Sequence, residues 1–263
     1  MIYKVESLFR KISKILKYFK IYPYINKLVE RYNSFLPWKI KDYLKMVSFY
    51  AQFLQKGDMV FDIGANVGEF TMNFLRMKTQ VVSVEPQLAC LKELYKRFGK
   101  NKRVTIVGKA LGREEGSDTI SISANETSIA TLSEKWKKEG RFSKNHEWTI
   151  DQKVQLTTVD HLIKSYGLPK FCKIDVEGFE LEVLKGLSHK IPIICFEFTK
   201  EFVDDALTCM KHLESLGNAN FNFVKNVRFK FNQPTWCSPN KLYQILVSDP
   251  DDFLWGDIYT IVR

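Results

Sequence analysis

The 263-residue sequence contains no apolar run long enough to cross a bilayer. A membrane-spanning helix needs about 20 predominantly apolar residues, whereas the longest apolar runs here are strand-sized, as at residues 191–198. The basic N-terminus also lacks the continuous apolar core and the small-residue cleavage site of a secretory signal. These absences predict a cytoplasmic protein.

Cysteine and histidine are both scarce. The five cysteines include no CxxC pair, and the four histidines are scattered along the chain. This pattern excludes a disulfide framework and a zinc site, and it is typical of a reducing compartment.

The charge of the chain is concentrated at one end. Hydrophobic residues make up 45% of the chain and aromatic residues 14%, which excludes disordered and fibrous classes. The net charge is +10, but residues 1–56 hold twelve basic and three acidic residues, a net +9, which leaves +1 for residues 57–263. We therefore predict a basic helical extension over residues 1–56 and an enzyme-like domain over residues 57–263.

The basic extension begins with an amphipathic pattern. Apolar residues recur from Val5 to Phe19 at helical spacing, with Lys and Arg on the remaining surface. Such a helix either lies in an anionic membrane interface or docks its apolar stripe on protein. Both readings stay open, and residues 4–20 are the segment that would contact a membrane. Further helices are predicted over residues 25–35 and 40–54.

The rest of the chain alternates between strands and helices. Runs rich in Val, Ile and Phe occur at residues 59–63, 80–84, 104–107, 171–174 and 193–198, and helical patterns at 69–77, 87–98, 179–187 and 201–216. This alternation predicts an α/β fold with a mostly parallel sheet covered on both faces. Residues 117–157 break the alternation, so we expect an insertion over the sheet with one strand at 119–123. Two terminal runs, 221–231 and 242–247, predict an antiparallel edge.

A glycine-rich turn follows the first predicted strand, in the run Asp62-Ile63-Gly64-Ala65-Asn66-Val67-Gly68. A turn of this kind, between a strand and a helix, lets a ligand approach the backbone closely. The second strand ends in Glu85-Pro86, where an acid is well placed to bond both hydroxyls of a ribose. The two features together predict an adenosine-binding site.

The turn disfavours a dinucleotide. The dinucleotide pattern needs a glycine where Asn66 stands, and Glu69 would place a negative charge beside a pyrophosphate. Asp62 and Glu69 instead favour a ligand with cationic groups. S-adenosylmethionine (AdoMet), which carries an ammonium and a sulfonium, fits this requirement, and an NAD-dependent oxidoreductase does not.

Four blocks in order resemble the FkbM family of AdoMet-dependent methyltransferases over roughly residues 57–200. They are the turn at Asp62–Gly68, Val84-Glu85-Pro86, Ala110-Leu111-Gly112 and Lys173-Ile174-Asp175-Val176-Glu177-Gly178. The resemblance implies a Rossmann-like, seven-stranded AdoMet-binding sheet and methylation of a hydroxyl, often on a sugar or a natural product.

The resemblance also implies a set of cofactor-binding residues. The methionine end of AdoMet would be lined by Asp62, Gly64, Asn66 and Gly68. Glu85 would hold the ribose, Pro86 and Ala110 would lie beside the adenine, and Asp175 would face the methyl group and the acceptor.

The fourth predicted strand ends in three ionisable residues, Lys173, Asp175 and Glu177. Such groups at a buried strand end are costly unless they are paired or used. Asp175 or Glu177 could accept the hydroxyl proton, with Glu197 a weaker candidate. Alternatively, Lys173 pairs with Asp175 while Glu177 caps or lines the next helix. A divalent metal at the two acids would lack a convincing third ligand, so no metal is predicted.

The acceptor is less well defined than the cofactor. The basic charge suggests a nucleic-acid methyltransferase, but it is confined to residues 1–56, and no Asn/Asp-Pro-Pro-aromatic box is present to hold a flipped base. A non-catalytic module is disfavoured because every expected acid is present. We therefore predict a methyltransferase acting on a small-molecule or glycan hydroxyl, with no nucleic-acid partner. Trp136 and the hydroxyl side chains of residues 117–157 could bind that acceptor, or could be ordinary surface residues.

Overall fold

The computed structural model describes residues 38–123, 129–143, 146–226 and 229–262. The chain divides into two compact units, residues 1–53 and 54–263. In the described part of the first unit lies helix α3 (Trp38–Tyr50), where the sequence predicts a helix over residues 40–54. The predicted helices over residues 5–19 and 25–35, and the membrane contact of residues 4–20, lie outside the described residues. No helix in the described ranges is long and apolar enough to cross a membrane.

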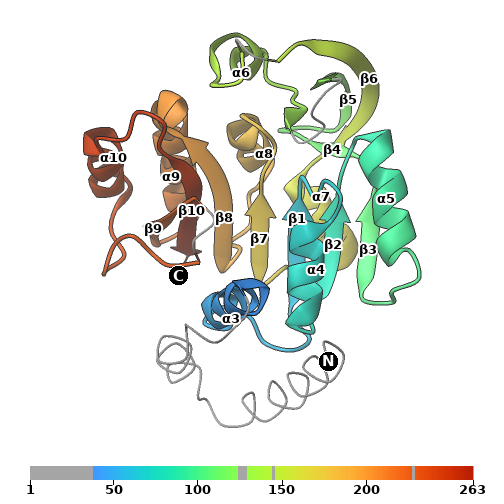
Figure 1. The fold of residues 1–263 in the computed structure, drawn as a ribbon, viewed down its shortest axis with the longest axis horizontal. Helices are drawn as coiled ribbons and strands as arrows, with labels where there is room; N and C mark the ends of the chain where they lie inside the picture. Colours follow the sequence, from blue (N-terminus) through green and yellow to red (C-terminus); the bar gives the residue numbers. More distant parts are fainter. Residues whose placement is uncertain (1–37, 124–128, 144–145, 227–228, 263) are drawn as a thin grey trace. The chain divides into compact units, whose positions relative to one another are not determined.

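A seven-stranded sheet forms the centre of the second unit, in the order β3-β2-β1-β7-β8-β10-β9 (Figure 1). Five neighbouring strands are parallel: β1 (Met59–Ile63), β2 (Gln80–Val84), β3 (Val104–Val107), β7 (Phe171–Ile174) and β8 (Ile193–Thr199). Strand β10 (Trp255–Val262) runs antiparallel between β8 and β9 (Ala219–Lys225). The predicted fold class, a mostly parallel α/β sheet with an antiparallel edge, is confirmed.

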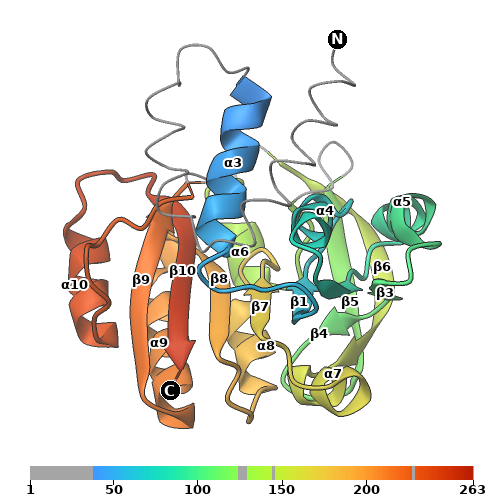
Figure 2. The same ribbon diagram turned by 90° about the horizontal axis from the view of Figure 1, so that it is seen from below.

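Helices cover both faces of this sheet (Figure 2). On one face lie α4 (Glu69–Arg76) and α5 (Leu88–Phe98), and on the other lie α7 (Val159–Tyr166), α8 (Glu180–Lys185) and α9 (Val203–Leu216). The largest hydrophobic cluster fills the space between the sheet and the second group of helices. Strand β7 is buried at every position, and its residues are apolar except for Lys173. The sheet is therefore a rigid platform whose carboxyl ends carry the predicted site residues.

The insertion contains more strand than the sequence predicts. Strands β4 (Ala110–Leu111), β6 (Trp148–Thr157) and β5 (Gly116–Ser123) form a second, three-stranded sheet in that order, and α6 (Glu134–Glu139) follows β5 along the chain. Figure 1 shows this layer at the carboxyl ends of the parallel strands. Strand β6 is missing from the prediction because most of its side chains are polar and only Val154 and Thr157 are buried. The insertion thus closes over the end of the sheet where the site lies.

The predicted strand at residues 242–247 is wrong. These residues belong to helix α10 (Pro239–Ser248), which begins with Ser238 as N-cap and Pro239 in its first turn. Leu242 and Leu246, four residues apart, are buried on one helix face. The second antiparallel strand is β10 instead, and the run predicted at 221–231 contributes only its first part, to β9.

Candidate functional site

A cavity of about 460 Å³ opens at the carboxyl ends of β1, β2 and β7. Seven of the ten predicted site residues line it: Gly64, Asn66, Glu85, Pro86, Ala110, Asp175 and Glu177. Ile120, Ala130 and Leu132 of the insertion complete the wall. The topology therefore brings together residues that are as far apart as 113 positions in the sequence, at the place where open α/β sheets bind their ligands.

Gly64 is required at the end of β1 by a close backbone approach. Its φ is +78°, and a Cβ there would lie 1.7 Å from the carbonyl oxygen of Asp175. The amide groups of Gly64 and Ala65 both donate to the Val84 carbonyl. The glycine thus lets the ends of β1 and β7 meet, and the two site segments are held against each other by main chain.

The carboxylate of Glu85 is fixed by two backbone donors. The amide of Asn66 donates to Oε2 and the amide of Gln87 donates to Oε1, both at 2.8 Å. Glu85 is only 2% exposed, and burial raises its pKa to about 7 despite these hydrogen bonds. Each carboxylate oxygen accepts more than one hydrogen bond, so further acceptor capacity remains for a ligand hydroxyl.

Asp62 and Gly68 lie behind the wall of the cavity. The hydroxyl of Thr71 donates to Asp62 Oδ2 at 2.6 Å and also bonds to Ser83 at 2.8 Å. Burial raises the pKa of Asp62. A Cβ on Gly68, at φ +85°, would meet the side chains of Phe98 and Leu94. In this structure both residues hold the turn in place, and their predicted contact with the cofactor stays a prediction.

Lys173 is a buried cation beneath the site. Its Nζ lies 2.5 Å from Asp175 Oδ2 and 4.3 Å from the ring centre of Phe70. Burial lowers its pKa, but the carboxylates of Asp175 and Asp257 outweigh this effect and hold the pKa above its ordinary value. The pairing of Lys173 with Asp175, which the sequence left as an alternative, is confirmed. Lys173 itself does not line the cavity.

Glu180, and not Glu177, accepts hydrogen bonds from the backbone amides that precede α8. Glu180 Oε1 lies 3.0 Å from the amide of Val176 and 3.3 Å from that of Gly178. Glu177 instead has a left-handed backbone conformation, with φ +54°, and its carbonyl accepts from Thr131 at 2.7 Å. This turn leaves the Glu177 side chain at the cavity wall.

Two further acids join the site from the antiparallel side of the sheet. Strand pairing places Phe196 beside Ile174, which brings Glu197 level with Asp175, and Asp257 of β10 pairs with Glu197. One carboxylate oxygen each from Asp175, Glu177 and Glu197 lies within 4.8 Å of the other two. Glu197 supplies the third oxygen ligand that a divalent cation would need. The sequence analysis did not identify Asp257, because it predicted no strand over the residues that form β10.

Negative charge accumulates at this end of the sheet. Burial and the neighbouring carboxylates raise the pKa values of Glu177 and Glu197 well above the ordinary range, and burial raises that of Asp257 to about 6. Among the described residues, Lys173 and Arg141 act on these acids as cations, against six carboxyls, those of Asp62, Asp175, Glu177, Glu180, Glu197 and Asp257. Such a surplus favours a ligand that brings positive charge.

Comparison with known proteins gives a family match and a curated relative. A family model described as the methyltransferase FkbM domain matches residues 62–223. The hexuronic acid methyltransferase AglP of Haloferax volcanii is 25% identical over 171 residues, which cover 60% of this chain and 63% of that protein. The match thus spans less than two thirds of the relative.

Solved structures resemble the fold at low sequence identity. A precorrin-6y C5,15-methyltransferase from Geobacter metallireducens superposes with a TM-score of 0.44 and 11% identity, over 84% of this chain and 87% of the other. An rRNA methylase from Streptococcus thermophilus gives a TM-score of 0.42 and 11% identity, over 81% and 92%.

Proposed function

Because this chain belongs to the FkbM family of methyltransferases and its cofactor is S-adenosylmethionine, we propose that it methylates a hydroxyl of a sugar, a glycan or another small molecule. The observation that carries the proposal is the group of carboxylates of Asp175, Glu177 and Glu197, which lie within 4.8 Å of one another where the cofactor cavity meets the end of β8. The named activity of the Haloferax relative, on a hexuronic acid, supports a sugar as the acceptor class.

The volume and the charge of the first cavity support AdoMet as its occupant. Its volume of about 460 Å³ lies in the range of small-molecule sites. In our proposal Glu85 accepts the ribose hydroxyls, Pro86 and Ala110 flank the adenine, and Gly64 and Asn66 line the methionine end. When bound, AdoMet supplies a methyl group on a positively charged sulfur. The surplus of carboxyls around Asp175 offers the compensating negative charge.

Methylation of a hydroxyl also requires a group that takes the proton. A general base works best when its pKa lies near the operating pH. Glu177 lines the cavity, and burial and the neighbouring acids raise its pKa, which makes it a stronger base than an ordinary carboxylate. Asp175, in contrast, is already paired with Lys173. We assign proton acceptance to Glu177 and the orientation of the site to the Asp175–Lys173 pair.

Transfer of a labelled methyl group from AdoMet to hydroxylated acceptors tests this proposal. Glu177→Gln keeps the shape of the side chain but cannot take a proton, so kcat should fall by about 10²–10⁴-fold, while the Kd for AdoMet stays within about twofold. Glu93→Gln, which removes an exposed carboxylate from α5, is the matched control and should behave as the wild type.

Two outcomes would contradict the proposal. Unchanged turnover in Glu177→Gln would remove Glu177 from the reaction. Methylation of RNA or DNA with no methylation of sugars would replace the acceptor class.

A further inference from the structure

A second cavity, of about 450 Å³, lies between α6, α8, α9 and the carboxyl end of β8. It adjoins the first, because Leu132 and Phe179 line both. Glu197 lines the second cavity, and its carboxylate lies within 4.8 Å of the carboxylates of Asp175 and Glu177, which line the first. A molecule in the second cavity would therefore lie beside this group of carboxylates, next to the first cavity.

The walls of the second cavity are aromatic. The rings of Trp136 and Phe202 lie 5.5 Å apart at an angle of 39°, and Phe179 contributes a third ring. Trp136 packs against the turn that carries Glu177, since a Cβ on Gly178 would lie 2.8 Å from the indole. Ligand sites commonly combine such apolar walls with a few polar groups that fix orientation.

Two polar atoms in these walls are buried without a hydrogen bond. Trp136 is 3% exposed and Thr199 is 4% exposed. Within the residues that the structure describes, neither Trp136 Nε1 nor Thr199 Oγ1 has a partner. Buried polar groups are nearly always satisfied, so each such group calls for a physical explanation. Both residues line the second cavity, so a polyhydroxylated ring bound there would bring oxygen atoms close to these buried groups.

The charge of the second cavity discriminates among such rings. Its lining includes the acids Glu134, Glu180, Glu182, Glu197 and Asp205, but Lys135 is the one cation among the lining residues that the structure describes. Lys135 is itself paired with Asp205 at 2.7 Å. Glu182 pairs with Arg113 and Lys185, and Glu134 pairs with Lys137, three cations that lie outside the lining. Among the described residues, Glu180 and Glu197 are therefore the lining acids that no ion pair neutralises. A carboxylate on the ligand would face repulsion here, whereas a neutral hydroxyl or an ammonium group would not.

We propose that the second cavity is the acceptor site and that it takes a neutral or amino-bearing sugar ring rather than a hexuronic acid. This inference rests on the proposed function and deepens it, because it names where the acceptor binds and which sugars are rejected. It separates this chain from the named activity of its Haloferax relative.

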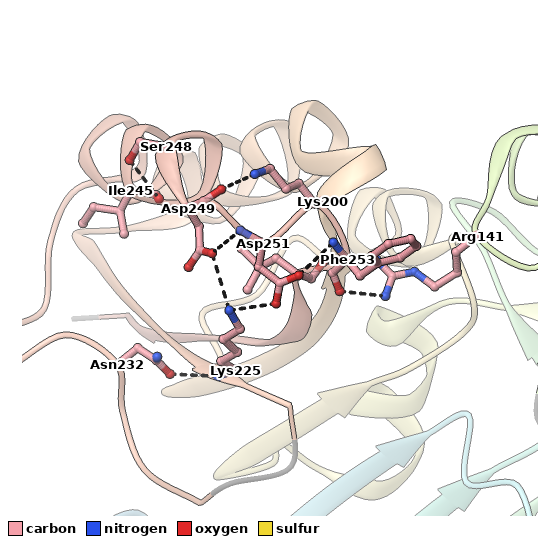
Figure 3. Close-up of polar contacts among 10 residues, drawn as sticks. Arg141, Lys200, Lys225, Asn232, Ile245, Ser248, Asp249, Asp251 and Phe253 are labelled. Carbon is pink, nitrogen blue, oxygen red and sulfur yellow. Dashed lines mark hydrogen bonds and ion pairs between the residues drawn. The ribbon is translucent and has the colours of Figure 1, made fainter.

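A polar network holds the Trp136 wall in position. Arg141, shortly after α6, bonds to both carboxylate oxygens of Glu201, at 2.9 and 2.6 Å. Figure 3 shows the same guanidinium reaching the Phe253 carbonyl, at 3.3 Å. The loop that precedes Phe253 is held by Lys225, whose Nζ forms ion pairs with Asp249 at 3.4 Å and with Asp251 at 2.9 Å. Arg141 thus links the segment after α6 to Glu201, the neighbour of the lining residue Phe202.

The substrate test compares three probes of one ring: a methyl hexoside, its amino analogue and its 6-carboxylate analogue. Methyl transfer from AdoMet should be at least about tenfold more efficient, in kcat/KM, with the first two than with the carboxylate. Asp205→Asn releases Lys135 from its ion pair, so it should raise the relative efficiency of the carboxylate probe by about threefold, as expected for a partly exposed charge.

The site test uses two buried threonines as a matched pair. Thr199→Val and Thr260→Val each remove an unpartnered hydroxyl from a buried position, but only Thr199 lines the cavity. Neither change should lower thermal stability, because no protein hydrogen bond is lost. Thr199→Val should raise the acceptor KM by about fivefold or more with the AdoMet Kd unchanged, while Thr260→Val should leave both at wild-type values.

The possible outcomes test the acceptor site and the proposed function separately. Equal acceptor KM values in the two threonine variants would overturn the placement of the acceptor while leaving hydroxyl methylation intact. Efficient methylation of the carboxylate probe would overturn the charge discrimination. AdoMet binding without transfer to any of the three probes would overturn the proposed function and this inference with it.

Discussion

The buried carboxyl of Glu85 should make the stability of the cofactor-free protein fall as pH rises. Its pKa is about 7 in the folded protein, against an ordinary value of 4.5. Between these values the folded protein holds a proton that the unfolded chain has released, so folding becomes less favourable with increasing pH. At 1.36 kcal/mol per unit of pKa, the full shift corresponds to about 3 kcal/mol.

Glu85→Gln isolates this contribution. The amide cannot titrate, but its NH₂ group faces one of the two backbone donors, so one hydrogen bond is lost at every pH at a cost of about 1–3 kcal/mol. The informative quantity is therefore the difference in unfolding free energy between pH 5 and pH 8, measured by urea titration without AdoMet. This difference should be roughly 2–3 kcal/mol larger in the wild type than in the variant. The raised pKa values of Glu180 and Asp257 act in both proteins and cancel.

AdoMet binding provides the second measurement on the same variant. Loss of one charge-assisted bond to the ribose should weaken binding by about 10–100-fold at pH 8. Wild-type affinity should also decline below pH 7, because the carboxyl must lose its proton to accept both hydroxyls, and this decline should be absent in Glu85→Gln. Identical pH differences in the two proteins would refute the buried, protonated carboxyl. Identical affinities would refute its contact with the ribose.

Two further substitutions test the architecture around the site. Gly64→Ala should lower the free energy of unfolding by at least about 3 kcal/mol, because the added Cβ would collide with the Asp175 carbonyl. Gly57→Ala, at φ +94° with open space around it, is the control and should cost only about 1–2 kcal/mol. Similar losses for the two variants in a urea titration would contradict the close approach of Gly64 to Asp175. Lys173→Met leaves the Asp175 carboxylate without its cation and should cost about 3 kcal/mol at pH 8. That loss should shrink at acidic pH as the carboxyls take up protons, and a loss independent of pH would show that packing, not charge, is what Lys173 provides.

The sequence alone predicted much of the part of the fold that carries the cofactor-binding residues. The positions of the five parallel strands and of the turn from Gly64 to Gly68 follow from local patterns. Four of these strands, β1, β2, β7 and β8, are mostly buried and therefore read as short apolar runs. The position of Glu85 at the end of β2 follows from the same pattern. The pairing of Lys173 with Asp175 needed only the two-residue alternation of a strand.

The end of the sheet beside the proposed acceptor cavity was decided by tertiary structure. The run at 242–247 is apolar enough for either a strand or a helix, and the packing of Leu242 and Leu246 settles it as a helix. Asp257 joins the site because β10 inserts between β8 and β9, a choice of pairing that no local period encodes.

The second cavity has the same origin. Trp136, Glu197 and Phe202 meet there from separate elements. Local periodicity fixes which face of one element is apolar. Which faces then meet, and which charged groups are left facing one another, depends on contacts between residues far apart in the chain. That is why the sequence identified the cofactor, while the second cavity, our proposed acceptor site, emerged only from the folded structure.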